Sequence, residues 1–259
     1  MALNFPDSPV DGETTTQPNG VTYRWSAAKT RWDASLVPVA PAILGAVTML
    51  AASDAAWVPD GRTVYIRFTV TGAGGGGGGV QSSTGSGTLS NGGCGGATAI
   101  KGSDVIDASY NVTIGAGGAG GAAGQNNGAA GGASTVVSAT LDLNGAGGFG
   151  GDGRSSGTNT NRVGKVGPLA TGGDTNIPGG DAQSGAVVES RPTLSTTSGG
   201  SFWGHGRRIP NNDIPDHGNA PGVGGSGNSH NDNSTNRAGG DGADGICMIE
   251  EFFAAPVTV

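Results

Sequence analysis

The sequence predicts an all-β, largely irregular chain, in which a small N-terminal β-meander precedes a large glycine-rich domain with little or no α-helix. Two observations carry this prediction. All but four of the 54 glycines lie between Gly72 and Gly245, and hydrophobic residues make up only 34% of the chain. Glycine weakens a regular helix or strand by roughly 0.5–1 kcal/mol per residue relative to alanine. A folded glycine-rich stretch must therefore exploit the missing side chain.

Three structures are possible for this glycine-rich stretch: a collagen-like triple helix, a packed array of extended helices, and a flexible coil. Collagen requires glycine at every third position and abundant proline. This chain has no strict triplet period and 13 prolines in 259 residues. Apolar segments between the glycine runs, such as residues 110–114 and 135–137, argue against a flexible coil. We therefore expect an ordered domain held by backbone hydrogen bonds and close packing.

Residues 1–35 are rich in turn signals. Asn19-Gly20 precedes the alternating segment 21–25, a pattern typical of a β-hairpin. We expect a small β-meander here in which four aromatic residues stack, namely Phe5, Tyr23, Trp25 and Trp32. A unit of this size is marginal alone, so it is expected to need a partner or an oligomer.

This N-terminal passage resembles short modules that recur in structural proteins of tailed phages. The matching residues are Phe5, Pro6, Ser8, Pro9, Pro18, Asn19, Gly20, Tyr23, Trp25 and Trp32. The resemblance implies attachment within a virion rather than catalysis. It makes the aromatic residues Phe5, Tyr23, Trp25 and Trp32 the candidates for attachment to other virion proteins.

Residues 36–56 are expected to form a Pro/Ala-rich connector. Two X-Pro steps, at Pro38 and Pro41, favour extended or polyproline geometry. Residues 47–52 fit either a short strand or a helical turn, because periodicity alone does not separate the two.

The glycine-rich domain is expected to span residues 57–253, with residues 254–259 as a tail. Residues 63–70 alternate as a half-buried strand does. One side carries Val64, Ile66, Phe68 and Val70, and the other Tyr65, Arg67 and Thr69. Residues 246–253 have the same strand character. We expect the two strands to lie near each other and to close the domain at one end.

Residues 57–253 look like the glycine-rich domains of phage tail-fibre proteins. The resemblance is carried by Trp57-Val58-Pro59-Asp60-Gly61, the strand entering Gly72-Ala73-Gly74-Gly75, residues 131–135, and residues 239–245. The glycine runs are also similar to those of the receptor-binding adhesins at the tips of T-even-type long tail fibres. That similarity implies packed polyglycine-II helices as scaffold and variable loops that contact the bacterial surface. The N-terminal module does not resemble that of these adhesins.

Five polar inserts interrupt the glycine runs, at roughly residues 80–91, 125–130, 152–163, 181–198 and 201–237. The last is richest in groups that suit contacts with carbohydrate or outer-membrane proteins, because aromatic faces stack while arginine side chains and carboxylates bind hydroxyl groups. Its receptor-contact candidates are Phe202, Trp203, His205, Arg207, Arg208, Asn211, Asn212, Asp213, Asp216 and His217. The alternative is an ordinary long loop that Phe202 and Trp203 anchor to the scaffold.

Neither a metal, a cofactor nor catalysis is predicted. His205, His217 and His230 share one insert but have no standard ligand spacing. Gly-Gly-Asp recurs four times, at residues 150–152, 172–174, 179–181 and 239–241. It resembles calcium-binding β-roll repeats without their nine-residue period, and aspartates that cap exposed backbone amides explain it as well. No phosphate-binding loop or nucleophile elbow has its required context.

The composition of the chain limits the kinds of partner that we expect. The net charge is −7, and lysines and arginines do not cluster beyond Arg207-Arg208, so no nucleic-acid partner is expected. A secretory signal and a run of about 18 apolar residues are both missing. For Cys94 and Cys247, buried free thiols are favoured, with a disulfide left open.

The resemblance implies a non-enzymatic virion protein of a tailed phage, assembled in the bacterial cytoplasm. We expect a tail-fibre or adhesin component that recognises the host surface, an outer-membrane protein or a glycan, through its polar loops. Its other partners would be tail-fibre, baseplate or capsid proteins, and trimers are common among phage fibres. The alternative is a capsid decoration or tail-assembly protein with a purely structural role.

Overall fold

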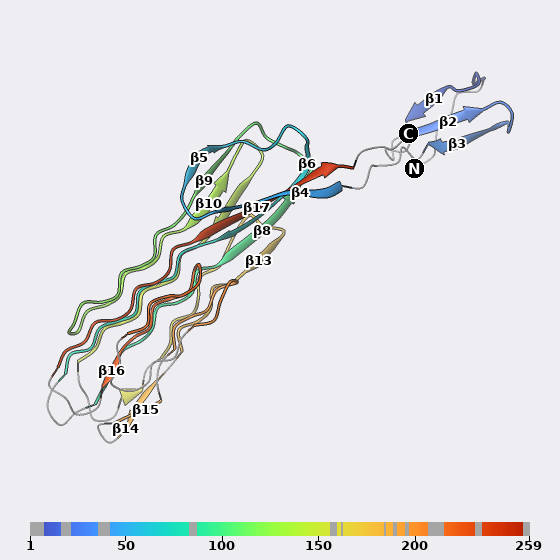
Figure 1. Ribbon diagram of the computed structural model, residues 1–259. Helices are drawn as coiled ribbons and strands as arrows, with labels where there is room; N and C mark the ends of the chain where they lie inside the picture. Colours follow the sequence, from blue (N-terminus) through green and yellow to red (C-terminus); the bar gives the residue numbers. More distant parts are fainter. Residues whose placement is uncertain are drawn as a thin grey trace. The chain divides into compact units, whose positions relative to one another are not determined.

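The computed structural model describes residues 8–16, 22–35, 42–82, 87–155, 160–161, 163–183, 185–188, 191–194, 197–206, 215–230 and 235–255. The chain divides into two compact units, residues 1–42 with 254–259 and residues 43–253. Every helix or strand in the described part of the chain is a β-strand (Figure 1), which confirms the all-β prediction. A search of the same residues for a helix able to cross a membrane finds none.

The first unit contains the predicted β-meander. Its antiparallel sheet has the order β1-β2-β3, formed by β1 (Thr14–Thr16), β2 (Thr22–Ser26) and β3 (Arg31–Ser35). Trp25 and Trp32 face each other across β2 and β3, with ring centroids 5.6 Å apart. Tyr23 pairs with Thr15 of β1. Phe5, the fourth predicted stacking residue, lies outside the described residues.

Two sheets form one end of the second unit (Figure 1). The larger has the order β13-β8-β6-β17-β4, made of β13 (Thr175–Ile177), β8 (Thr98–Ser103), β6 (Thr63–Thr71), β17 (Ile246–Ala254) and β4 (Ala42–Leu50). The smaller has the order β11-β10-β9-β5, made of β11 (Asp142–Gly145), β10 (Ser134–Val137), β9 (Tyr110–Thr113) and β5 (Asp54–Trp57). As predicted, β6 and β17 are antiparallel neighbours, with Phe68 opposite Ile249.

Most of the predicted connector is instead part of these sheets. Residues 42–50 form β4, and residues 54–57 form β5, so the extended alternative holds for residues 42–45 and the strand alternative for residues 47–50. Gly45 makes the β4 path possible, because a Cβ there would lie 2.2 Å from the ring of Phe253. Residues 36–41 lie outside the described residues.

A side-chain core joins residues of both sheets. Ile66, Phe68 and Val70 of β6 are fully buried, and the Phe68 ring lies 4.8 Å from Tyr110 and 6.3 Å from Trp57, centroid to centroid. The predicted alternation of buried and exposed residues in β6 fails at two residues, one near each end of the strand. Val64, at the start of β6, is 43% exposed, and Thr69, on the opposite side, is buried.

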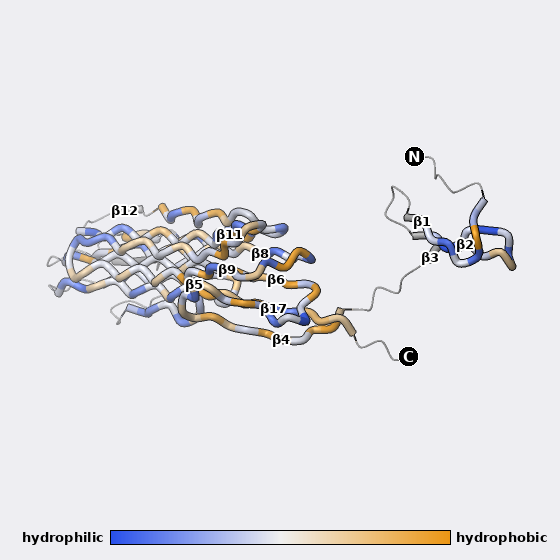
Figure 2. The backbone as a smooth tube through the Cα atoms, turned by 90° about the horizontal axis from the view of Figure 1, so that it is seen from above, coloured by the Kyte–Doolittle hydropathy of each residue, from blue (hydrophilic) through white to orange (hydrophobic). Residues whose placement is uncertain are grey.

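The rest of the second unit is an array of extended segments that run side by side (Figure 2). Backbone hydrogen bonds place residues 72–80 at its centre. Gly72, Gly75 and Gly78 donate their N–H groups to the carbonyls of residues 97, 94 and 91. The residues after them, 73, 76 and 79, donate to residues 132, 129 and 126. Residues 74, 77 and 80 donate to residues 243, 240 and 237. Successive amides thus point to three different neighbours with a period of three, the geometry of a polyglycine-II helix.

The carbonyls of this central helix point to three further neighbours. Gly148, Gly151 and Arg154 donate to residues 73, 76 and 79, while Gly118, Gly121 and Gly124 donate to residues 74, 77 and 80. Gly225 donates to Gly75. The central helix therefore has six neighbours, three antiparallel and three parallel, and residues 72–80 are all buried.

The array needs glycine because the backbones touch. A Cβ on Gly77 would lie 1.8 Å from the carbonyl oxygen of Ser226. The φ angles of residues 72–80 are outside the left-handed region, so conformation is not the reason. In the outer segment 115–124 the period of three is visible in burial, since Gly115, Gly118 and Gly121 are buried while Ala116, Ala119 and Ala122 are exposed.

Aspartates complete hydrogen bonds at the edge of the array. Gly120 donates its N–H to Asp241 Oδ1 and Gly117 donates to Asp244 Oδ1, each at 2.7 Å. Likewise Gly167 donates to Asp181. Of the two explanations left open for the Gly-Gly-Asp repeat, capping of backbone amides is thus the one observed for Asp181 and Asp241. Among the described residues, no three His, Cys, Asp or Glu side chains are grouped to hold a metal ion.

This edge role predicts a local effect of replacing Asp241 with alanine. We expect the Gly120 amide to exchange its hydrogen faster, while the Gly117 amide, whose acceptor is Asp244, stays protected. The cost in stability should be about 0.5–1.5 kcal/mol, the net value of one hydrogen bond. Hydrogen exchange followed by NMR measures both amides in one sample, and Asp244→Ala should reverse the pattern. Equal exchange at Gly120 in both proteins would contradict the assignment.

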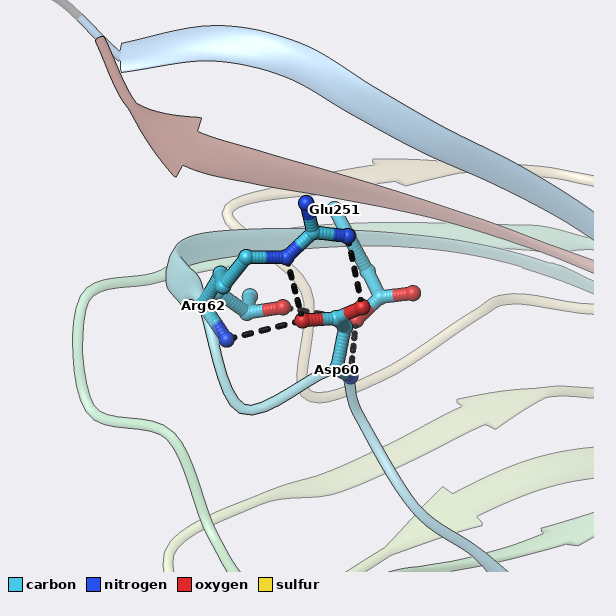
Figure 3. Close-up of polar contacts among 4 residues, drawn as sticks. Asp60, Arg62 and Glu251 are labelled. Carbon is cyan, nitrogen blue, oxygen red and sulfur yellow. Dashed lines mark hydrogen bonds and ion pairs between the residues drawn. The ribbon is translucent and has the colours of Figure 1, made fainter. Parts of the chain in front are cut away.

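A carboxylate cluster holds the turn before β6 (Figure 3). Glu251, only 6% exposed, accepts the Asp60 N–H and the Thr63 hydroxyl with the same oxygen, each at 2.7 Å. Arg62 donates to both carboxylate oxygens of Asp60, at 3.0 and 2.9 Å, and its guanidinium carbon lies 4.5 Å from the Phe253 ring centroid. The Arg62 side chain and backbone N–H lower the pKa of Asp60 from 3.8 to about 2.

The lowered pKa of Asp60 makes the stability of the folded state depend on pH. Because the folded pKa of Asp60 is below its ordinary value, the ionised form favours the folded state above about pH 4, and this contribution is lost as the pH falls towards about 2. We expect Arg62→Gln to raise the pKa of Asp60 towards 3.8. Titration of the Asp60 carboxyl carbon by NMR measures this directly. A midpoint that stays near 2 in the variant would show that the Arg62 side chain is not the cause, since the backbone N–H of residue 62 is retained.

Both cysteines are buried free thiols. Cys94 Sγ donates to the Lys165 carbonyl at 3.3 Å, and burial raises the pKa of Cys247 to about 12. The favoured prediction for the two cysteines is confirmed, and neither thiol is ionised near neutral pH.

Candidate binding groove

A groove of about 620 Å³ lies between residues 177–183 and 197–206. Two glycine pairs form its base. Gly180 donates its N–H to Gly200, and Gly95 donates to Gly180, each at 2.9 Å. A Cβ on Gly206 would lie 1.7 Å from the Ser198 carbonyl oxygen. The groove is therefore built directly on the packed backbone of the array.

A tight turn presents residues 202 and 203. Ser201 donates its N–H to the Gly204 carbonyl at 2.8 Å. The Ser201 hydroxyl donates to the Pro221 carbonyl at 2.6 Å and accepts the Trp203 N–H at 3.1 Å. These three hydrogen bonds fix the turn from within and attach it to the segment that follows.

The two aromatic residues of this turn have different roles. Trp203 Nε1 donates to Thr71 Oγ1 at 2.8 Å, and that hydroxyl also bonds Thr98 Oγ1 at 2.8 Å. Trp203 is thus an anchor, as the alternative interpretation of the insert predicts. Phe202 packs edge-to-face on Trp203, with centroids 5.1 Å apart, and remains 48% exposed along the groove. Its ring is available to a ligand.

Polar groups line the opposite part of the groove. Asp181 uses Oδ1 to accept the Gly167 N–H at 2.7 Å, and within the described residues Oδ2 has no partner. Gln183, whose backbone N–H bonds the Thr197 carbonyl, is exposed, as is His205. Asp181 is the one carboxylate in the described lining, which contains no lysine or arginine.

The structure brings together only part of the predicted contact set. Phe202 and His205 line the groove, whereas Asp216 and His217 do not. The Asp216 carbonyl accepts the Ser226 N–H, and His217 Nδ1 accepts the Asp241 N–H at 2.9 Å. The remaining candidates lie outside the described residues: Arg207, Arg208, Asn211, Asn212 and Asp213.

Asp181, Gln183 and Thr197 were missed as site residues. They belong to the insert 181–198, which has no aromatic residue and no cluster of charges. A signal was nonetheless present, because Gly179-Gly180 before this insert and Gly199-Gly200 after it can pair through their backbones. That pairing places the ends of the insert beside the turn that carries Phe202.

The five inserts have residues at the end of the array opposite the two large sheets (Figure 1). Val80 marks this end of the central helix. It forms β-bridges with Arg154 and Arg237, and Gly79 before it bonds Asn126. The short strands here are β7 (Thr88–Leu89), β12 (Thr160–Asn161), β14 (Ala186–Val188), β15 (Arg191–Leu194) and β16 (Ser229–His230). β7 pairs with β16, and β14 and β15 lie beside β7.

Residues 50–251 match the protein family described as a glycine-rich domain. This span covers the polyglycine-II array, the groove and most of both large sheets, and leaves the N-terminal meander outside. No curated protein matches the chain.

Proposed function

This chain belongs to the glycine-rich domain family, and from that premise we propose that it is a virion protein of a tailed phage. Its role is that of a tail-fibre or adhesin component that recognises the bacterial host surface through polar inserts on the glycine-rich scaffold. The ligand is a surface glycan or an outer-membrane protein.

The observation that carries this proposal is the gathering of the five inserts. Inserts that begin as far apart in the sequence as residues 80 and 201 have residues at one end of the array, around Val80 and β7. The scaffold beneath them is held by backbone bonds that do not depend on the insert side chains. Such a division supports a recognition surface, because loops on a rigid frame can differ in sequence without disturbing the frame.

The proposed role is binding rather than catalysis. Hydrolysis of a glycan ordinarily uses two carboxyl groups that flank the bond to be broken. The described lining of the groove contains one, Asp181. A polar groove beside a fixed aromatic ring suits recognition without a chemical step.

Residues 1–35 are proposed to attach the protein to other virion proteins of the tail fibre, baseplate or capsid. Trp25 and Trp32 stack across two strands of a sheet with only three. A sheet this small buries little surface of its own, so a partner or a second and third copy of the chain would stabilise it.

Immunogold electron microscopy on the phage, paired with competition of adsorption by the purified chain, tests this function. Label at a fibre tip together with blocked adsorption is the expected result. A chain in which another sequence replaces residues 207–214 should lose the competition, while Trp203 keeps its bond to Thr71 and Gly225 its bond to Gly75. Label on the capsid or tail shaft without competition would overturn the adhesin role and favour a decoration or assembly protein.

A further inference from the structure

The groove combines one exposed aromatic ring with several hydrogen-bonding groups. Phe202 is 48% exposed at its rim, and Asp181, Gln183 and His205 line it. Its volume of about 620 Å³ lies within the range of roughly 300–1,000 Å³ that small-molecule sites occupy. Sugars need this combination, because the C–H face of a hexose packs on an aromatic ring while its hydroxyl groups require donors and acceptors at the edge.

The ring is held in place before any ligand arrives. Phe202 packs edge-to-face on Trp203 at an interplanar angle of 88°, and Trp203 is bonded to Thr71 of β6. The hydrogen bonds of Ser201 to Gly204 and Pro221 fix the backbone on either side. Binding therefore removes little conformational entropy from the Phe202 side chain. A small ligand that makes few contacts can for this reason still bind.

The charge of the groove favours neutral sugars over acidic ones. Asp181 places a carboxylate at the groove, and its Oδ2 has no partner among the residues that the structure describes. Lysine and arginine are missing from the described lining. A carboxylate accepts hydrogen bonds from hydroxyl groups and repels an acidic sugar.

We propose that this groove binds a neutral glycan. A hexose residue stacks on Phe202, and its hydroxyl groups bond Asp181 Oδ2, Gln183 and His205. The inference rests on the proposed host-surface role and extends it to a groove that begins at the β6 end of the array, where Trp203 bonds Thr71, rather than at the end marked by Val80. A protein receptor is the less suitable occupant, because protein interfaces centre on tryptophan, tyrosine and arginine side chains, and beside the Phe202 ring the apolar part of the described lining is limited to Ile177 and Pro178.

Saturation-transfer NMR on the full chain tests the inference. The probes are the methyl glycosides of glucose, galactose, mannose and N-acetylglucosamine, with galacturonic acid and N-acetylneuraminic acid as acidic probes. We expect at least one neutral glycoside to bind with a dissociation constant of about 1–10 mM, and the acidic sugars to bind more weakly. Binding of none of the neutral glycosides at about 50 mM would overturn the inference, and so would preference for an acidic sugar.

Two phenylalanines provide a matched pair of variants. Phe202→Ala should weaken binding about tenfold or more, and Phe202→Leu should weaken it too, because leucine lacks the flat ring face. Phe149→Ala should leave the affinity unchanged, since Phe149 is 49% exposed but lies outside the groove. If Phe202→Ala changes the melting temperature, Gln183→Ala at the exposed polar side gives an independent reading. Unchanged binding in both Phe202→Leu and Gln183→Ala would contradict the inference.

The same protein samples separate this inference from the proposed function. Blocked phage adsorption without binding of any neutral glycoside would leave the host-surface role standing and refute the neutral glycan as the ligand of this groove. Binding through Phe202 without blocked adsorption would support the glycan and refute the host-surface role.

Discussion

Gly77→Ala is expected to destabilise the second unit by about 3 kcal/mol or more, at the upper end of the range for overpacked interiors. The added Cβ would lie 1.8 Å from the Ser226 carbonyl oxygen and 2.3 Å from its carbonyl carbon. Neither atom belongs to a flexible side chain. The Gly77 N–H and carbonyl are bonded to Gly240 and Gly121 as well, so relief of the clash must move three neighbouring backbones.

The matched control for this change is Gly61→Ala. A Cβ on Gly61 meets no atom within 4 Å, and its φ angle is outside the left-handed region. The control should differ from the parent protein by less than about 0.5 kcal/mol. Thermal unfolding of the three proteins distinguishes them, with a fall of roughly 6–12 °C expected for Gly77→Ala. A Gly77→Ala protein that melts with its control would mean that the array is not close-packed at this residue.

The second large effect is expected from Phe68→Ala, at about 3–5 kcal/mol. Phe68 is fully buried and contacts the rings of Tyr110 and Trp57, which come from the other sheet. Alanine would remove both ring contacts and leave a cavity at the centre of the core. Because β6 continues directly into residues 72–80, the loss should destabilise the glycine array along with the sheets.

Phe149→Ala is the control for Phe68→Ala, because Phe149 is 49% exposed. It should change the free energy of unfolding by less than about 0.5 kcal/mol. Urea denaturation followed by tryptophan fluorescence gives both values. Phe68→Ala should lower the midpoint in a single transition, while a second, unshifted transition would show that the array folds independently of the core.

The strands whose side chains form the core could be predicted from the sequence. So could the close packing of backbones in the glycine-rich part. Strand β6 shows its alternation in Ile66, Phe68 and Val70, and β17 shows a similar pattern. For the glycine runs, the absence of a triplet period argued against collagen and the apolar segments argued against a flexible coil. Packed polyglycine-II helices were implied by the resemblance of these runs to those of adhesins. The pairing of β6 with β17 followed, since both strands flank that array in the sequence.

The arrangement inside the array could not be predicted in the same way. A buried glycine offers a neighbour only an amide and a carbonyl, and these are alike in every run. Nothing local therefore identifies Ala129 rather than another residue as the acceptor for Gly76. The groove could not be predicted for the same reason. Asp181 lies near Phe202 only because Gly180 pairs with Gly200.

Elsewhere tertiary contacts decided what the local pattern left open or predicted wrongly. The X-Pro steps at Pro38 and Pro41 indicated extended or polyproline geometry, and residues 42–50 form the extended strand β4 beside β17. Thr69 lies on the side of β6 predicted to face outward and is nevertheless buried. Of the two interpretations of Phe202-Trp203, the anchor holds for Trp203, which bonds Thr71, whereas Phe202 stays 48% exposed. No sequence pattern indicates Thr71 as the partner.

The central helix, residues 72–80, also determines how the stability of this protein responds to temperature. Its burial removes mainly amides and carbonyls from water, with few methyl groups. Exposure of polar surface on unfolding lowers the heat capacity, whereas exposure of apolar surface raises it. The heat-capacity change per residue should therefore fall below the usual 12–15 cal/mol/K, roughly, of globular domains. The stability curve becomes flatter, so the scaffold loses less of its stability in the cold than a protein built on a hydrophobic core.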